Sequence, residues 1–276
     1  MSPDFVASDC RPGPVILLGL GFTTRRLARL LLLRGISSYA IARQRSRFRD
    51  LVAAGLRVEE PEICAQKALP ANSVLIHTIP PLPPDENENL RKLILGLKPR
   101  RIIYISSTSV YGNHIVVDAR TAAEPSEEKG QRRVEEENWI ARNAGSSLIL
   151  RPAAIYGPGR GVHVRIKEGR SSRAAGTAMV SRVHVDDLAA LLLAGVESEL
   201  EGAWPVADDL PCSTDAITAW CRHLIGQSQT AAPAEPIRIA GRQVNGRDIR
   251  DFLRVSFAYP SYYEGILASL AEIPVP

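Results

Sequence analysis

The segment Pro14–Gly35, PVILLGLGFTTRRLARLLLLRG, constrains the fold most, because two glycines join an apolar run to a long helical stretch. The run Val15–Leu18 is typical of a strand buried on both faces. Gly19 permits a tight turn, and Gly21 lets backbone N–H groups approach a pyrophosphate whose charge the helix N-terminus favours. Thr24 replaces the third glycine of the G-x-G-x-x-G pattern. The segment therefore predicts a nucleotide-phosphate site, with a merely tight strand–helix turn as the alternative.

The end of the next strand bears on the kind of nucleotide. Ile36–Ala42 is a second strand candidate, and Arg43, Gln44, Arg45, Ser46 and Arg47 follow it. A carboxylate at this place would bond the ribose 2′-hydroxyl of NAD, whereas arginines and a serine suit the 2′-phosphate of NADP. We expect NADP, with NAD as the second choice. A solvated basic start to the next helix is the other interpretation.

Strand-like and helix-like segments alternate through the first half of the chain, which predicts an α/β fold with a doubly wound parallel sheet of the Rossmann type. The predicted strands are Val15–Leu18, Tyr39–Ala42, Leu56–Glu59, Ser73–His77 and Arg101–Ser106, with a sixth at Ser147–Leu150. The predicted helices among them are Thr24–Arg34, Ser46–Ala54, Asn87–Leu97 and Ser126–Asn143.

The second half predicts a small C-terminal substrate lobe. We expect an NADP-binding domain over 1–157, with contributions up to about 200, and the lobe over 158–276. Gly157–Gly176 is rich in Gly, Arg and Ser and predicts a mobile loop, and segment 227–245 predicts a linker. The remaining predicted helices or short elements are Asp186–Val196, Ser213–Gly226 with Ser213 or Thr214 as N-cap, Ile249–Val255 and Tyr262–Leu270.

Ligands of open parallel sheets bind at the carboxyl ends of the strands. The segment His77-Thr78-Ile79-Pro80 follows the fourth predicted strand and leads into the proline-rich loop Pro80–Pro84. We expect it to form one wall of the cofactor pocket. A loop that only leads into the next helix is the alternative.

Composition excludes several other classes of protein. The net charge is +4, the apolar content is 45%, and the arginines are scattered among acids without aromatic interleaving, so we expect no nucleic-acid partner. The run Leu30–Leu33 is far too short to span a bilayer, and the N-terminus MSPDFVASDC does not have the pattern of a signal peptide. The sequence thus predicts a cytoplasmic protein without a membrane partner, whose partners are anionic small molecules.

The cysteines show no metal-binding or disulfide pattern. Cys10, Cys64, Cys212 and Cys221 form no C-x-x-C pair or zinc spacing. We expect them to be reduced and packed, and we expect no metal site.

Three further motifs follow the glycine turn in order. They are YISSTSVYG at 104–112, LRPAAIYGPG at 150–159 and VHVDDLA at 183–189. Together these motifs resemble the extended short-chain dehydrogenase/reductase superfamily, of the NAD-dependent epimerase/dehydratase type, with the atypical YeeZ-like subgroup nearest in pattern. The resemblance covers about residues 14 to 270.

The resemblance implies roles for residues of each motif. Ser107 would hydrogen-bond the reacting carbonyl or hydroxyl, because a hydroxyl can both donate and accept. Pro152 to Ile155 would line the nicotinamide. His184 would begin the helix that closes the substrate side, with a helix cap and a packed imidazole as the alternative. The full set of expected cofactor-binding residues is Gly19, Gly21, Phe22, Thr23, Thr24, Arg43, Arg45, Ser46, Thr78, Ile79, Pro80, Ser106, Pro152 and Ile155.

The chain departs from the family pattern at the Tyr-x-x-x-Lys motif, in which the tyrosine is the acid/base. The segment Pro125–Glu137, PSEEKGQRRVEEE, contains no tyrosine. Alignment places Glu127 and Gln131 at the two positions, and a slip of one residue gives Glu128 and Arg132.

Three accounts of this departure remain open. Another residue supplies the proton, with Tyr111 as the first candidate and Tyr156 or Glu127 as further ones, although Tyr111 also fits a packing role. Alternatively, solvent or substrate supplies the proton. In the third account the protein binds NADP without redox chemistry, as a sensor or regulatory protein.

A basic loop suggests the charge of the substrate. Planar guanidinium groups suit phosphate or carboxylate, so we expect Arg165, Arg182 and His184 to contact an anionic substrate such as a nucleotide-linked sugar. A solvated loop is the alternative. The basic residues of this region are Arg160, Arg165, Lys167, Arg170, Arg173 and Arg182. The resemblance also implies a homodimer through two helices, one of them Ser126–Asn143, whose heavy charge disfavours that pairing.

Overall fold

The computed structural model of the protein describes residues 13–64, 69–70, 72–169, 178–226 and 241–272. The expectations for the N-terminal stretch with Cys10, for Arg170 and Arg173, and for most of segment 227–245 lie outside the described residues.

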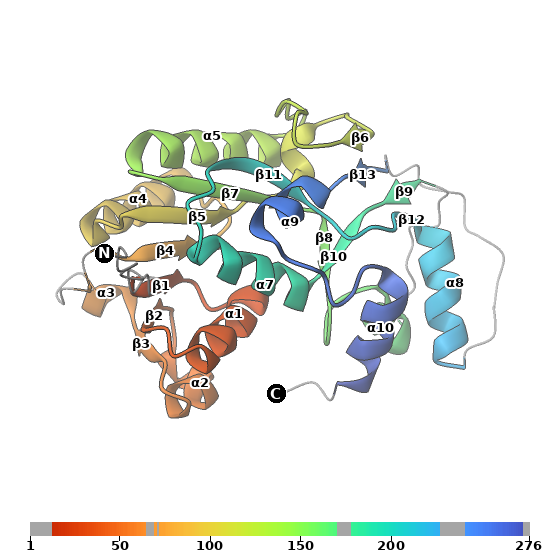
Figure 1. The fold of residues 1–276 in the computed structure, drawn as a ribbon, viewed down its shortest axis with the longest axis horizontal. Helices are drawn as coiled ribbons and strands as arrows, with labels where there is room; N and C mark the ends of the chain where they lie inside the picture. Colours follow the sequence, from red (N-terminus) through yellow and green to blue (C-terminus); the bar gives the residue numbers. More distant parts are fainter. Residues whose placement is uncertain (1–12, 65–68, 71, 170–177, 227–240, 273–276) are drawn as a thin grey trace, which may run out of the picture.

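A seven-stranded sheet forms the centre of the molecule (Figure 1), and every neighbouring pair of its strands is parallel. The strand order is β11-β7-β5-β4-β1-β2-β3, so the chain reverses direction across the sheet beside β1. The predicted doubly wound parallel sheet is confirmed. Its strands are β1 (Val15–Leu18), β2 (Ser38–Ile41), β3 (Arg57–Glu59), β4 (Val74–His77), β5 (Arg101–Ile105), β7 (Ser147–Pro152) and β11 (Gly202–Val206).

Helices cover both faces of this sheet, because side chains that alternate along each strand point to opposite faces. In β1, Val15 and Leu17 face one apolar layer, and Ile16 and Leu18 face the other. The first layer holds α1 (Phe22–Leu33), α2 (Arg49–Ala53) and α7 (Val185–Val196). The second holds α4 (Pro84–Leu97) and α5 (Glu128–Asn143). Each buried aliphatic side chain in these layers contributes about 1.5–3 kcal/mol.

A third apolar cluster forms a lobe beside the sheet (Figure 1). It joins α6 (Val162–Lys167), α8 (Thr214–Leu224) and α10 (Tyr262–Ala271). The short elements are η1 (Arg45–Phe48), α3 (Pro61–Cys64), η2 (Thr108–Tyr111), β6 (Val116–Val117), β8 (Ala154–Tyr156), β9 (Met179–Val180), β10 (Arg182–His184), β12 (Cys212–Ser213), β13 (Gln243–Val244) and α9 (Arg247–Leu253).

Three regions differ from the sequence prediction. The edge strand β11 was not expected from the sequence. The loop predicted for Gly157–Gly176 contains α6, because Val162, His163 and Ile166 form an apolar face that the lobe buries. Segment 227–245 ends in β13, which pairs with β6. None of the helices in the described residues is long and apolar enough to cross a membrane.

Candidate functional site

The glycine turn between β1 and α1 has the geometry that a bound anion needs. Gly19 has a φ of +91°, which a side chain would strain, and a Cβ there would lie 3.2 Å from Ile79 and 3.3 Å from the Thr78 hydroxyl. A Cβ on Gly21 would meet nothing within 4 Å. The backbone of α1 therefore begins against open space. Its first turn contains no acidic residue, so no side-chain carboxylate offsets the positive end of the helix dipole.

Thr24 holds this turn in the absence of a third glycine. Its Oγ1 accepts from the Gly21 N–H at 2.8 Å and donates to the Gly19 carbonyl at 2.8 Å. One hydroxyl thus bridges both sides of the turn. The departure from G-x-G-x-x-G therefore leaves the turn closed, with Gly21 exposed at the start of the helix.

A cavity of about 630 Å³ opens at the carboxyl edge of the sheet, directly over this turn. It runs from the start of α1 past the ends of β4, β5 and β7, which is where ligands of such sheets bind. The structure brings most of the predicted site residues to it. Those that line it are Gly21, Phe22, Thr23, Thr24, Thr78, Pro80, Ser106, Ser107, Pro152 and Ile155.

Other predicted residues lie outside this cavity. Gly19 and Ile79 lie behind the turn, in contact with each other. Arg43, Arg45 and Ser46 follow β2 at the same edge of the sheet, and all three are exposed. The Arg45 N–H donates to the Glu60 carboxylate at 3.3 Å.

Two serines that follow β5, Ser106 and Ser107, line the cavity. Ser107 caps η2, and its Oγ accepts from the Ser109 N–H at 3.2 Å, so its hydroxyl proton stays available for a ligand. Ser106 is buried, and no described residue bonds its hydroxyl. Of the two, Ser107 is therefore the candidate donor to a bound oxygen atom, because the Ser106 Oγ is buried.

Tyr111 does not reach the cavity. It is fully buried, and its hydroxyl accepts from Arg151, which is itself paired with Glu137 at 2.6 Å. Burial raises the pKa of Tyr111. The packing interpretation describes this tyrosine, because its ring and hydroxyl are both engaged in the core beneath η2.

His77 also packs rather than lining the cavity. Its ring lies 4.8 Å from that of Tyr104, and its Nε2 is 3.7 Å from a carboxylate oxygen of Glu136. Burial lowers the pKa of His77. The wall predicted from residues 77–80 is therefore made by Thr78 and Pro80 alone.

A second cavity of about 530 Å³ adjoins the first on the side of the lobe. It contains Arg165 and Arg182, as predicted for the substrate side, together with the buried His163. Arg182 is nearly buried, and it donates to the Val180 carbonyl at 2.8 Å and to the Cys212 Sγ at 3.0 Å. The residues that line both cavities are Ala154, Ile155, Arg160 and Val180.

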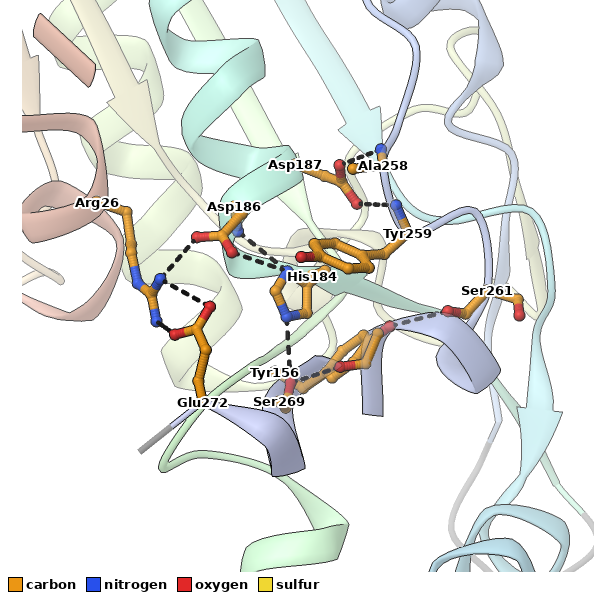
Figure 2. A network of polar contacts seen from close by, with 11 residues as sticks. Arg26, Tyr156, His184, Asp186, Asp187, Ala258, Tyr259, Ser261, Ser269 and Glu272 are labelled. Atoms are coloured by element: carbon orange, nitrogen blue, oxygen red, sulfur yellow. Dashed lines mark hydrogen bonds and ion pairs between the residues drawn. The ribbon is translucent and has the colours of Figure 1, made fainter. Parts of the chain in front are cut away.

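Residues of the VHVDDLA motif connect the start of α7 to α10 and to the segment that precedes α10 (Figure 2). His184 is fully buried and lines neither cavity; its Nδ1 accepts from the Asp186 N–H, and its Nε2 lies 3.2 Å from the Ser269 hydroxyl. Burial and the charge of Arg26 lower the pKa of His184 to about 4. The helix-cap interpretation of His184 describes this geometry.

The second aspartate of the motif fastens the segment before α10 to α7 (Figure 2). Asp187 accepts from the N–H groups of Ala258 at 2.7 Å and Tyr259 at 3.1 Å. Burial raises its pKa to about 6. Arg26 of α1 completes the network through Asp186 at 3.3 Å and Glu272 at 2.9 Å.

Cys212 and Cys221 are free and buried, as predicted. Within the part of the chain that the structure describes, no three His, Cys, Asp or Glu side chains gather as a metal site would require.

Solved structures share this fold over almost the whole chain. A functionally unknown conserved protein from Silicibacter pomeroyi is 26% identical, with a TM-score of 0.76 over 94% of this chain and 98% of its own. A variant of the UDP-glucuronic acid 4-epimerase from Bacillus cereus, solved with NAD and a fluorinated substrate analogue, is 18% identical, with a TM-score of 0.75 over 92% of this chain and 97% of its own. The ADP-L-glycero-D-manno-heptose-6-epimerase from Helicobacter pylori is 16% identical, with a TM-score of 0.75 over 95% and 97%.

No family model matches the sequence, and no curated protein does. The chain shares its fold with these two epimerases. The resemblance expected from the four motifs is thus confirmed at the level of the fold.

Two side chains of α5 that lie four residues apart, the spacing of the Tyr-x-x-x-Lys motif, reach the cavity. Lys129 and Arg133 of α5 line the cavity. Neither predicted pair, Glu127 with Gln131 or Glu128 with Arg132, does so. The spacing Lys-x-x-x-Arg is visible in the sequence, one residue beyond the slip that we considered. A search for any two polar residues four apart would have found it.

Proposed function

We propose that the protein is an atypical NADP-dependent oxidoreductase or epimerase-like enzyme that acts on an anionic small molecule. The main observation in support of this proposal is that one cavity extends from the glycine turn at the start of α1 to Ser107. Its residues fit a dinucleotide, because Gly21 leaves room for a diphosphate over the start of α1. The solved structures of similar fold include epimerases with bound NAD.

The choice of NADP over NAD rests on Arg43 and Arg45. Both are exposed beyond β2, at the carboxyl edge of the sheet where an adenosine ribose would lie. Guanidinium groups pair well with a 2′-phosphate, whereas a carboxylate is the better partner for a ribose hydroxyl. Ser46 adds a hydroxyl beside them.

The substrate is proposed to occupy the second cavity. Arg160, Arg165 and Arg182 give that space positive charge, which suits the phosphate or carboxylate of a nucleotide-linked sugar. The lobe of α6, α8 and α10 would then hold the substrate, whereas α7 and β11, which also lie beyond residue 157, belong to the sheet and its helix layer. The part of the substrate that reacts would then reach across Ile155 toward Ser107.

A bound nicotinamide supplies hydride transfer to or from carbon, and the protein supplies position and polarisation. The Ser107 hydroxyl donates to the substrate oxygen, whose charge changes as the carbon gains or loses hydride. Thr24 keeps the glycine turn closed, and Pro152 and Ile155 give the reacting end an apolar wall.

Calorimetric titration with NADPH, NADP⁺, NADH and NAD⁺ tests the cofactor, and a panel of carboxylated or phosphorylated carbonyls and nucleotide-linked sugars tests turnover. We expect binding of NADP(H) and turnover of at least one compound. Ser107→Ala should lower kcat by about 10²–10³-fold, the usual effect of losing one such donor. Ser198→Ala, at the opposite edge of the sheet, is the control. If Ser107→Ala leaves turnover intact, the role of Ser107 is wrong.

The second candidate is a catalytically silent NADP-binding regulator. It is favoured by one observation, that no tyrosine, histidine or carboxylate is among the described residues lining the first cavity. Tight NADP(H) binding without turnover of any compound in the panel supports it, and turnover excludes it.

A further inference from the structure

The first cavity carries charge of one sign. Four cationic side chains line it, and no carboxylate is among its described lining residues. The four are Lys129, Arg133, Arg160 and Arg242. A cavity with this lining disfavours a cationic ligand group and favours an anionic or electron-rich one.

Three of these cations are already engaged with the protein. Arg242 donates to the carbonyls of Thr108, Gly112 and His114. Arg133 donates to the Tyr104 hydroxyl at 3.3 Å and the Ile105 carbonyl at 3.2 Å. The Arg160 guanidinium lies 5.3 Å from the centre of the Phe22 ring.

Lys129 differs from the other three. Among the described residues it has no hydrogen-bond or ion-pair partner, although its side chain is exposed to the cavity. The carboxylates on the inner face of α5 are engaged elsewhere, since Glu136 pairs with Arg91 at 2.7 Å and Glu137 pairs with Arg151 at 2.6 Å. The ammonium therefore keeps its three donors for a ligand.

The fold holds Lys129 beside the Ser107 loop. At the next residue, Gly130, a Cβ would lie 2.6 Å from the Ser109 carbonyl oxygen and 2.8 Å from Pro125. The first turn of α5 is thus pressed against η2, which Ser107 caps. Lys129 and Ser107 enter the same cavity from two elements in direct contact.

Lys129 is also the one lining residue, among the described residues, whose side chain is of a kind that serves as a general acid in enzymes. Arginines stay protonated, and the serine and threonine hydroxyls around them do not ionise. On the proposed function, we infer that Lys129 is the proton donor of this cavity, and that its charge makes the cavity select the reduced form of a nicotinamide cofactor. The site then works as a carbonyl reductase.

The reaction balances without any further reagent. The carbonyl carbon of the substrate gains a hydride from the reduced dinucleotide, and its oxygen gains a proton from the Lys129 ammonium. The C=O double bond becomes a C–O single bond with new C–H and O–H bonds, the dinucleotide that gives the hydride would be oxidised, and water restores the proton on Nζ. The Ser107 hydroxyl donates to the same oxygen while its negative charge develops.

Redox-dependent affinity tests this inference without a substrate. The nicotinamide ring is cationic when oxidised and neutral when reduced, so Lys129 should disfavour only the oxidised form. In calorimetric titrations of the full chain we expect NADPH to bind tighter than NADP⁺ by on the order of tenfold. Lys129→Met should reduce that ratio to about threefold or less. Lys92→Met, on the exposed side of α4, should leave the ratio unchanged.

The outcomes separate the two proposals. Failure of all four dinucleotides to bind contradicts the proposed function and removes the basis of the inference. Binding with equal affinity for both redox forms, or a ratio unchanged in Lys129→Met, overturns the inference alone.

The proton donor is tested by reduction of a panel of α-keto acids and phosphorylated aldehydes with NADPH. We expect oxidation of NADPH with at least one compound, a loss of at least about tenfold in Lys129→Met, and partial recovery in Lys129→Tyr, because a phenol also donates a proton. No reduction of any compound, or a Lys129→Met rate equal to the parent's, overturns the donor role.

Discussion

At the residue scale, we propose that the arginines after β2 decide which dinucleotide binds. We expect Arg43→Ala with Arg45→Ala to weaken NADPH binding by on the order of 100-fold or more, because two charge-assisted hydrogen bonds worth about 1.5–3 kcal/mol each would be lost. NADH binding should change little. Calorimetry with both ligands measures the difference, and Arg142→Ala at the far end of α5 is the control. Equal weakening of NADPH and NADH would show that these side chains do not contact a 2′-phosphate.

The buried imidazole of His184 makes stability depend on pH. Its pKa is about 4 in the folded protein, against about 6.5 in an unfolded chain. Between these values the unfolded state binds more protons, so the free energy of unfolding falls as the pH falls from about 6.5 toward 4. At pH 5 this loss is about 2 kcal/mol, at 1.36 kcal/mol for each pKa unit.

Urea unfolding at pH 7 and pH 5 measures this loss. His184→Asn keeps an N-cap side chain but cannot titrate, so its loss between the two pH values should be smaller by about 2 kcal/mol. The opposite contribution of Asp187, whose pKa is raised to about 6, is common to both proteins and cancels. If the free energy of unfolding falls equally between pH 7 and pH 5 in the parent and in His184→Asn, the imidazole is accessible to protons in the folded state.

At the scale of elements, the β1–α1 turn depends on one hydroxyl. Thr24→Val keeps the shape of the side chain but removes its bonds to Gly19 and Gly21. We expect a loss of about 1–3 kcal/mol in stability and weaker binding of all four dinucleotides, because a buried N–H and a carbonyl lose their partner. Thr218→Val in α8 is the control. Unchanged affinity would mean that the turn is held by its backbone alone.

The sequence predicts the sheet and its layers well, because apolar runs and glycine turns are local signals. Strand bounds agree within one or two residues, as in β1 and β2. The alternation along the chain also places Ser107 and Thr78 at the same edge of the sheet. The predicted site residues that the cavity gathers all lie near strand ends, where topology alone fixes position.

The sequence does not predict the site correctly where the direction of a side chain determines whether a residue reaches the cavity. Tyr111 is four residues from Ser107, but the turn of η2 sends its ring into the core toward Arg151. Lys129 was missed because the alignment followed the family's residue types, whereas helix phase selects the residue that faces the cavity. The helix α6 was not predicted, because the glycines and arginines in and around it obscure the spacing of its three buried side chains in the sequence.

At the scale of the whole molecule, two cavities meet where the sheet joins the lobe. Arg160 and Ile155 line both, so a ligand in one touches a wall of the other. The Arg26–Asp186–Glu272 network holds α1 and α7 of the sheet layer against α10 of the lobe. This arrangement suits a cofactor held by the sheet and a substrate held by the lobe. A homodimer through α5 stays a prediction.

A crystal structure of the protein with NADPH tests the central claim most directly. We predict density for the diphosphate against the backbone at the start of α1, beside Phe22 and Thr23, the 2′-phosphate beside Arg43 and Arg45, and the nicotinamide between Ser107 and Lys129. A diphosphate bound away from the β1–α1 turn, or a nicotinamide end outside the 630 Å³ cavity, would contradict the account.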